Sequence, residues 1–133
     1  MKNELEPLRL EALIVEDEID ICYLLSGILK KKHLRTAYVT TLSAAQTALE
    51  NQKPNILFID NHLPDGFGVD FIQKVKNQYP ETRIIMITAH DTSLDKEKAM
   101  KEGADFFIGK PFTHETISRT VDLVINNFYS SAR

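Results

Sequence analysis

Two apolar runs in the middle of this sequence show no alternation between polar and apolar side chains. Residues 56–59 are all large and apolar, and residues 83–88 enclose a second such run that ends on a hydroxyl group. Strands have this pattern when both of their faces are buried, as in a parallel sheet that helices cover on both sides. The pattern therefore limits the chain to folds with a covered, largely parallel sheet.

Segments of helical periodicity alternate with these and three further strand-like segments. A parallel strand pair needs a crossover connection, which is usually a helix, so this alternation supports the same interpretation. Helix-capping residues are available at Ser43, at Asp91, Thr92 or Ser93, and at Thr113, and Gly103 is a natural helix stop. The expected strands are residues 10–15, 36–40, 56–59, 83–88 and 104–108, and the expected helices begin near residues 19, 43, 69, 94 and 114.

This order predicts an α/β fold of the flavodoxin-like, doubly wound type, with a five-stranded parallel sheet and five helices. Right-handed crossovers and five strands favour the strand order 2-1-3-4-5. No glycine-rich turn follows the first strand, which argues against a dinucleotide-binding fold. The connections are too short for a second sheet, so we expect a single one.

The length of 133 residues and the charge balance restrict the class of protein further. The length suits one domain, which we place at residues 10–128, after a loose arm at 1–9 and before a frayed end or linker start at 129–133. A net charge of -3 argues against direct nucleic-acid binding. No apolar run is long enough to span a membrane, and Cys22 has no partner for a disulfide. We therefore expect a cytoplasmic domain that contacts no membrane.

Polar side chains follow four of the expected strands, at the point where each strand ends. Glu16 and Asp17 follow the first strand, Asp60 the third, Thr88 ends the fourth and Lys110 follows the fifth. The carboxyl ends of parallel strands meet at one sheet edge, where ligands bind in such folds. Three neighbouring carboxylates need a cation, and Mg²⁺ prefers oxygen ligands and bridges to phosphate. Asp60 is the natural nucleophile for phosphoryl transfer at this edge.

These residues resemble the receiver domains of two-component response regulators, of the chemotaxis-regulator type, over nearly the whole chain. No single motif is specific, but together they stand in the family's order at the expected strand ends. The matching stretches are Val15-Glu16-Asp17-Glu18, Ile59-Asp60, Leu63-Pro64-Asp65-Gly66 with Gly68, Ile87-Thr88-Ala89, and Gly103-Ala104-Asp105 with Lys110-Pro111-Phe112.

The resemblance implies a role for each matching residue. Asp60 would accept the phosphoryl group, and Glu16, Asp17, Asp60 and the backbone carbonyl of His62 would hold Mg²⁺, with Mn²⁺ as a substitute. Thr88 and Lys110 would contact the phosphoryl group, and Phe107 would be the aromatic residue that moves with Thr88. The Lys110–Pro111 bond would be cis. The switching face would be formed by the fourth helix, the fifth strand and the fifth helix.

Two histidines depart from the common pattern of the family. His62 and His90 lie two residues after Asp60 and Thr88. The resemblance implies that side chains at these positions flank the phosphoryl group and tune its lifetime. We therefore hypothesise a lifetime that depends on pH between about 5 and 8, where histidine titrates. A transition-metal site made from both histidines and Asp60 is a competing interpretation. His33 and His114 are expected at the surface.

The implied function is a signalling receiver that accepts a phosphoryl group from the phosphohistidine of a sensor kinase or phosphotransfer protein. It would catalyse its own phosphorylation and slow dephosphorylation and act on no external substrate. Its target would be a separate protein or a fused output domain, and it would be a monomer or a phosphorylation-dependent dimer. Phe106 and the lysines of the fourth helix argue against the symmetric salt-bridged dimer of many DNA-binding regulators.

Two alternatives of other classes remain. One is a receiver-fold interaction domain that works without phosphate. The other is a Mg²⁺-dependent phosphohydrolase with an aspartyl intermediate, which would normally carry an acid at the position of His62.

Overall fold

The computed structural model describes residues 9–131, so the expected arm at residues 1–9 lies outside this range except for Arg9. The sequence forms the strands β1 (Glu11–Val15), β2 (Arg35–Val39), β3 (Ile56–Ile59), β4 (His62–Leu63), β5 (Gly66–Phe67), β6 (Arg83–Thr88) and β7 (Phe106–Gly109). The helices are α1 (Ile19–Lys31), α2 (Leu42–Asn51), α3 (Gly68–Gln78), α4 (Ser93–Glu102) and α5 (His114–Ser131).

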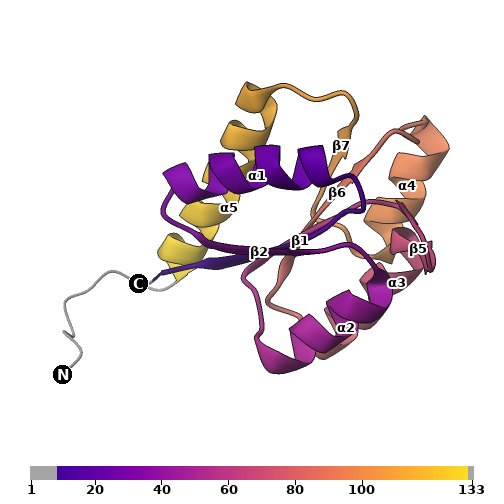
Figure 1. Ribbon diagram of the computed structural model, residues 1–133, viewed down its shortest axis with the longest axis horizontal. Coiled ribbons are helices and arrows are strands. Elements are labelled where there is room, and N and C mark those ends of the chain that lie inside the picture. Colours follow the sequence, from indigo (N-terminus) through magenta and orange to yellow (C-terminus); the bar gives the residue numbers. More distant parts are fainter. Residues whose placement is uncertain (1–8, 132–133) are drawn as a thin grey trace.

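Five of these strands form one parallel sheet in the order β2-β1-β3-β6-β7. This is the expected order 2-1-3-4-5, counted over the strands of the main sheet. Figure 1 shows α1 and α5 on one face of the sheet and α2, α3 and α4 on the other. The doubly wound flavodoxin-like prediction is therefore confirmed.

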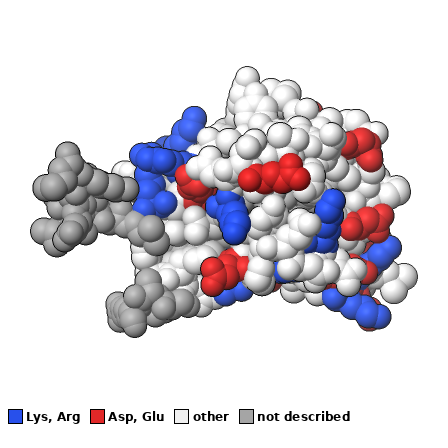
Figure 2. All heavy atoms as spheres, turned by 90° about the horizontal axis from the view of Figure 1, so that it is seen from below, with Lys and Arg blue, Asp and Glu red and all other residues white. Residues whose placement is uncertain are grey.

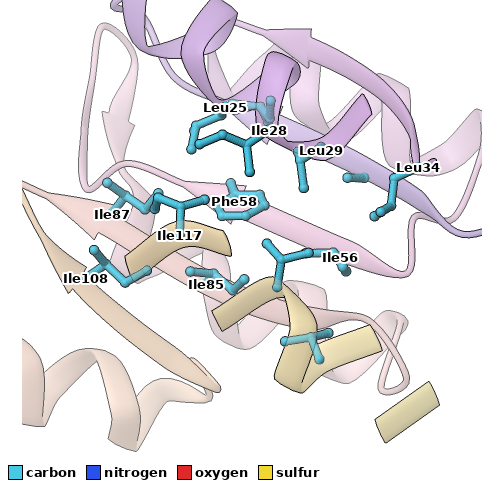
Figure 3. Close-up of a cluster of buried hydrophobic side chains, with 14 of the residues drawn as sticks. Leu25, Ile28, Leu29, Leu34, Ile56, Phe58, Ile85, Ile87, Ile108 and Ile117 are labelled. Atoms are coloured by element: carbon cyan, nitrogen blue, oxygen red, sulfur yellow. The ribbon is translucent and has the colours of Figure 1, made fainter. Parts of the chain in front are cut away.

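The hydrophobic core lies in two layers, one on each face of the sheet. In the layer under α1 and α5, Phe58 of β3 packs among aliphatic side chains of both helices and of the neighbouring strands (Figure 3). Leu57 and Ile59 point to the opposite layer, under α2, α3 and α4. Because every residue of β3 is buried, its uniformly apolar sequence is explained by burial on both faces.

Several local predictions differ from the structure. Thr41, rather than Ser43, caps α2, because its Oγ1 accepts a hydrogen bond from the backbone N–H of Ala44 at 3.0 Å. Within α1, Leu24 is exposed, whereas Leu25 and Leu29 are buried in the core. Helix α5 extends to Ser131, past the start of the expected frayed end at residue 129, and its half-buried Ile125 and Phe128 pack on the core.

The loop after β3 contains a second, two-stranded sheet, which the sequence analysis excluded. β4 and β5 pair antiparallel, with His62 opposite Phe67 and Leu63 opposite Gly66. Such a short hairpin escapes detection in the sequence because two residues are too few to show any periodicity. It gives the segment after Asp60 a defined shape.

Acidic and basic side chains are interspersed on the face of the molecule that is seen from below in Figure 2. This distribution leaves no broad field of positive charge on that face. Within residues 9–131, none of the helices is both long enough and apolar enough to cross a membrane.

Candidate functional site

Three carboxylates meet where β1 and β3 end. These strands are neighbours with Val15 paired to Ile59, and the N–H of Asp60 donates to the carbonyl of Val15 at 3.0 Å. Oxygens of Glu16, Asp17 and Asp60 all lie within 4.8 Å of one another. Glu16 and Asp60 are buried, whereas Asp17 is exposed.

Lys110 reaches this cluster from the end of β7. Its Nζ lies 2.7 Å from an oxygen of Glu16, 3.4 Å from one of Asp60 and 3.3 Å from one of Glu18. The Lys110–Pro111 peptide bond is cis, as the resemblance predicts. Burial alone would lower the pKa of Lys110, but the hydrogen bond with Glu16 and the charges of Asp60 and Glu16 raise it.

The electrostatics of the cluster favour a bound cation. Burial raises the pKa of Glu16 to about 7, and the nearby charge of Asp60 adds to the effect, although the hydrogen bond from Lys110 opposes it. Burial thus disfavours the charged form of Glu16 in spite of its hydrogen bond with Lys110. The donor set consists of carboxylate oxygens, which suits a hard divalent cation such as Mg²⁺. Glu16, Asp17 and Asp60 would hold it.

Thr88 and Phe107 lie on the neighbouring strands β6 and β7. Thr88 is opposite Gly109 in the sheet, and its carbonyl accepts from the N–H of Lys110 at 2.9 Å. The Thr88 hydroxyl accepts from the N–H of His90 at 3.1 Å. Thr88 and the half-buried Phe107 both line a cavity of about 270 Å³. The two side chains thus border the same space between the strand ends and the loops.

The two unusual histidines stack on each other at the rim of the same cavity. The ring centroids of His62 and His90 are 3.8 Å apart with an interplanar angle of 28°, and Phe67 contacts His62 edge-on at 5.2 Å. In the described part of the chain, the Glu16–Asp17–Asp60 cluster is the sole group of three or more acidic, histidine or cysteine side chains close enough to hold a metal. The transition-metal site from both histidines and Asp60 is therefore not formed.

Some residues that shape the site were missed or given no role in the sequence analysis. Glu18 shares Lys110 with the buried acids, and the Asn61 carbonyl accepts from the N–H of Gly68 at 2.8 Å. A Cβ atom on Gly68 would lie 2.2 Å from the carbonyl oxygen of Asp60. The spacing of Gly68 after Asp60 was visible in the sequence, but this close backbone approach was not. His33 and His114 are exposed, as expected.

The chain is similar in sequence to a response regulator protein and to a transcriptional regulatory protein. It is 36% identical over 103 residues to the response regulator protein PilR of Pseudomonas aeruginosa, covering 77% of this chain and 23% of that protein. It is 34% identical over 100 residues to the KDP operon transcriptional regulatory protein KdpE of Escherichia coli, covering 75% of this chain and 44% of KdpE. The chain thus spans less than half the length of these two relatives.

Solved structures share the whole fold. The beryllofluoride-activated receiver domain dimer of NtrC4 superposes with a TM-score of 0.83 at 31% identity, covering 89% of this chain and 98% of that one. The signal receiver domain of a putative LuxO repressor protein from Vibrio parahaemolyticus gives 0.87 at 26% identity, with coverage of 94% and 96%. The family model of the response regulator receiver domain matches residues 12–122. With its strand order and its acidic edge, the chain therefore belongs to the receiver domains of two-component response regulators.

Proposed function

We propose that Asp60 accepts a phosphoryl group in a Mg²⁺-dependent reaction and that this modification switches the face formed by α4, β7 and α5. The observation that carries the proposal is the cluster of Glu16, Asp17 and Asp60 within 4.8 Å, with Lys110 beside it. Mg²⁺, or Mn²⁺ in its place, would neutralise charge on the acids and on the entering phosphoryl group. The carbonyl of His62 is a further proposed ligand.

The donor is the phosphohistidine of a sensor kinase or phosphotransfer protein. A carboxylate oxygen of Asp60 attacks phosphorus, the P–O bond forms as the P–N bond breaks, and the leaving imidazole takes up a proton. Lys110 offers a positive charge to the phosphoryl oxygens, and Thr88 offers a hydroxyl donor. Water later cleaves the acyl phosphate slowly, which resets the switch. Because sensor kinases draw on ATP, we expect this exchange in the cytoplasm.

Phosphorylation changes the surface formed by α4, β7 and α5 and releases no compound that serves as the signal. Thr88 turns toward the phosphoryl group, and Phe107 moves into the cavity that both residues line. A differential affinity of a few kcal/mol is enough to shift such a two-state equilibrium. The readout is a downstream protein or a fused output domain, with the receiver as a monomer or a phosphorylation-dependent dimer. Helix α4 carries Lys96, Lys98 and Lys101 among the acids Asp95, Glu97 and Glu102, so it offers side chains of both charges for that contact.

One experiment tests the assignment. Three proteins are incubated with Mg²⁺ and acetyl phosphate, and their intact masses are measured. They are the wild type, Asp60→Asn, and the control Asp122→Asn, whose substitution lies on α5. The proposal predicts a gain of one phosphoryl group in the wild type and in Asp122→Asn, and none in Asp60→Asn. The absence of any gain in the wild type would favour a phosphate-independent interaction domain. Repeated turnover of a phosphomonoester would instead indicate a phosphohydrolase.

A further inference from the structure

Asp65 connects the loop that follows Asp60 to the start of helix α2. Its Oδ1 accepts a hydrogen bond from the N–H of Leu42 at 2.8 Å, and its Oδ2 accepts one from the N–H of Ser43 at 2.9 Å. These N–H groups belong to the first two residues of α2 and have no partner within the helix. Both hydrogen bonds lower the pKa of Asp65. The carboxylate also faces the positive end of the helix dipole.

The base of this loop is anchored independently of Asp65. The backbone carbonyl of Asn61 accepts from the N–H of Gly68 at 2.8 Å, and its side-chain oxygen accepts from the N–H of Val69 at 2.9 Å. These bonds join the end of β3 to the start of α3. They do not reach the turn at Pro64 and Asp65, although Leu63 of the hairpin is buried in the core layer under α2, α3 and α4.

The tip is a hairpin that cannot hold its shape alone. It has two residues in each strand, and an isolated two-stranded hairpin is marginal in water even when it is longer. Asp65 lies in its turn, between the paired residues Leu63 and Gly66. Gly66 also packs on α2, because a Cβ atom there would lie 3.0 Å from Cδ1 of Leu42. The start of α2 therefore holds the turn of the hairpin, in addition to the burial of Leu63 in the core.

We propose that Asp65 is a positioning residue for the cation site, because it holds the hairpin that carries the His62 carbonyl. This inference rests on the proposed function, in which that carbonyl is a ligand of Mg²⁺. Mg²⁺ demands near-octahedral geometry with short bonds of about 2.0–2.1 Å, so a loosely held carbonyl is a poor ligand. Asp65 touches neither the cation nor the phosphoryl group. Its effect passes through the backbone between residues 62 and 65.

The test compares Asp65→Ala and Asp65→Asn with Thr41→Ala. Thr41 is a matched control, since its hydroxyl also accepts from an N–H at the start of α2 but makes no link to the loop. The dissociation constant of Mg²⁺ is measured by titration calorimetry, and the phosphorylation rate with acetyl phosphate is measured against the Mg²⁺ concentration. We expect Asp65→Ala to weaken Mg²⁺ binding about tenfold, as the loss of a supporting contact at a metal site typically does.

The other two variants test whether the change in Mg²⁺ affinity comes from the link between the loop and α2. Asp65→Asn, which keeps one acceptor oxygen, should lie between the wild type and Asp65→Ala, and Thr41→Ala should stay within about twofold of the wild type. Saturating Mg²⁺ should restore most of the rate of Asp65→Ala, because the defect is in binding. The inference is overturned if Asp65→Ala and Thr41→Ala have the same dissociation constant for Mg²⁺ and the same dependence of the phosphorylation rate on the Mg²⁺ concentration. Asp65→Asn decides the question if Asp65→Ala does not fold.

A second readout separates this inference from the proposed function. If the wild type neither binds Mg²⁺ nor takes up a phosphoryl group, the proposed function fails, and the metal-free amide spectrum decides whether Asp65 holds the loop. Asp65→Ala should then displace the amide resonances of His62 and Gly66, whereas Thr41→Ala should leave them in place. Unchanged loop resonances in Asp65→Ala would refute the positioning role.

Discussion

Lys110 lies closer to Glu16 than to Asp60: its Nζ is 2.7 Å from the former carboxylate and 3.4 Å from the latter. In this state the lysine therefore neutralises a proposed cation ligand more strongly than the proposed phosphoryl acceptor. A cation at the acidic cluster would take over the neutralisation of Glu16. Lys110 would then be available for an anion on Asp60.

The first prediction concerns stability and pH in the metal-free protein. The pKa of Glu16 is raised from 4.5 to about 7, so between these values the folded state holds a proton that the unfolded state has lost. Stability from this group is complete below about pH 4.5 and is lost as the pH rises through about 7, because the folded state binds more protons in that window. The expected loss is about 3 kcal/mol, because one pKa unit corresponds to about 1.4 kcal/mol.

Urea unfolding between pH 4 and 8, with a chelator, measures this change. Glu16→Gln should remove the slope in that window, and the difference between the two proteins isolates Glu16 from other titrating groups. Saturating Mg²⁺ should reduce the slope in the wild type, because the cation favours the charged carboxylate. Equal slopes in the wild type and Glu16→Gln would contradict the assignment.

The second prediction separates cation binding from phosphoryl transfer. Lys110→Met removes the positive charge that competes with a cation for Glu16 and Asp60, so the affinity for Mg²⁺ should rise several-fold. The phosphorylation rate with acetyl phosphate should nevertheless fall by about 100-fold, since a preorganised charge at the phosphoryl oxygens is lost. Lys96→Met, on the exposed surface of α4, serves as the control and should change neither quantity. A parallel loss of affinity and rate in Lys110→Met would argue against this division of roles.

The third prediction concerns the lifetime of the phosphoryl group. The stacked rings of His62 and His90 cover the rim of the cavity that reaches Thr88. Replacing either histidine with alanine opens this rim to water, and we expect dephosphorylation to accelerate several-fold. The decay of the phosphorylated mass with time measures this rate, and an unchanged decay in both variants would refute the shielding role of the histidines.

The fourth prediction uses two glycines of the same chain. A Cβ atom on Gly68 would lie 2.2 Å from the carbonyl oxygen of Asp60, so Gly68→Ala must displace the backbone at the proposed acceptor. We expect a loss of about 2 kcal/mol or more in the free energy of unfolding, as for other overpacked sites. Gly27 in α1 has no heavy atom within 4 Å of its added Cβ, and Gly27→Ala should stabilise the protein by about 0.5–1 kcal/mol. Urea denaturation gives both values, and equal effects would show that the contact at Gly68 relaxes without cost.

Much of the fold was predictable because short stretches of sequence indicate its strands and helices. The uniformly apolar β3 and β6 identified strands with two buried faces, and their bounds at residues 56–59 and 83–88 agree with the structure. The strand ends then placed Glu16, Asp17, Asp60, Thr88 and Lys110 on one edge, since parallel strands share the direction of their carboxyl ends. The sequence by itself thus determined the sheet and which residues gather at its edge.

Only the tertiary structure decided which of those residues contact one another, and at what distances. Nothing in the sequence ranks Glu16 above Asp60 as the partner of Lys110, and nothing near Asp65 indicates that it binds the start of α2, more than 20 residues earlier. The stacking of His62 on His90 joins two loops in the same way. Such pairings depend on distances between segments remote in the chain, and local periodicity and capping signals carry no information about those distances.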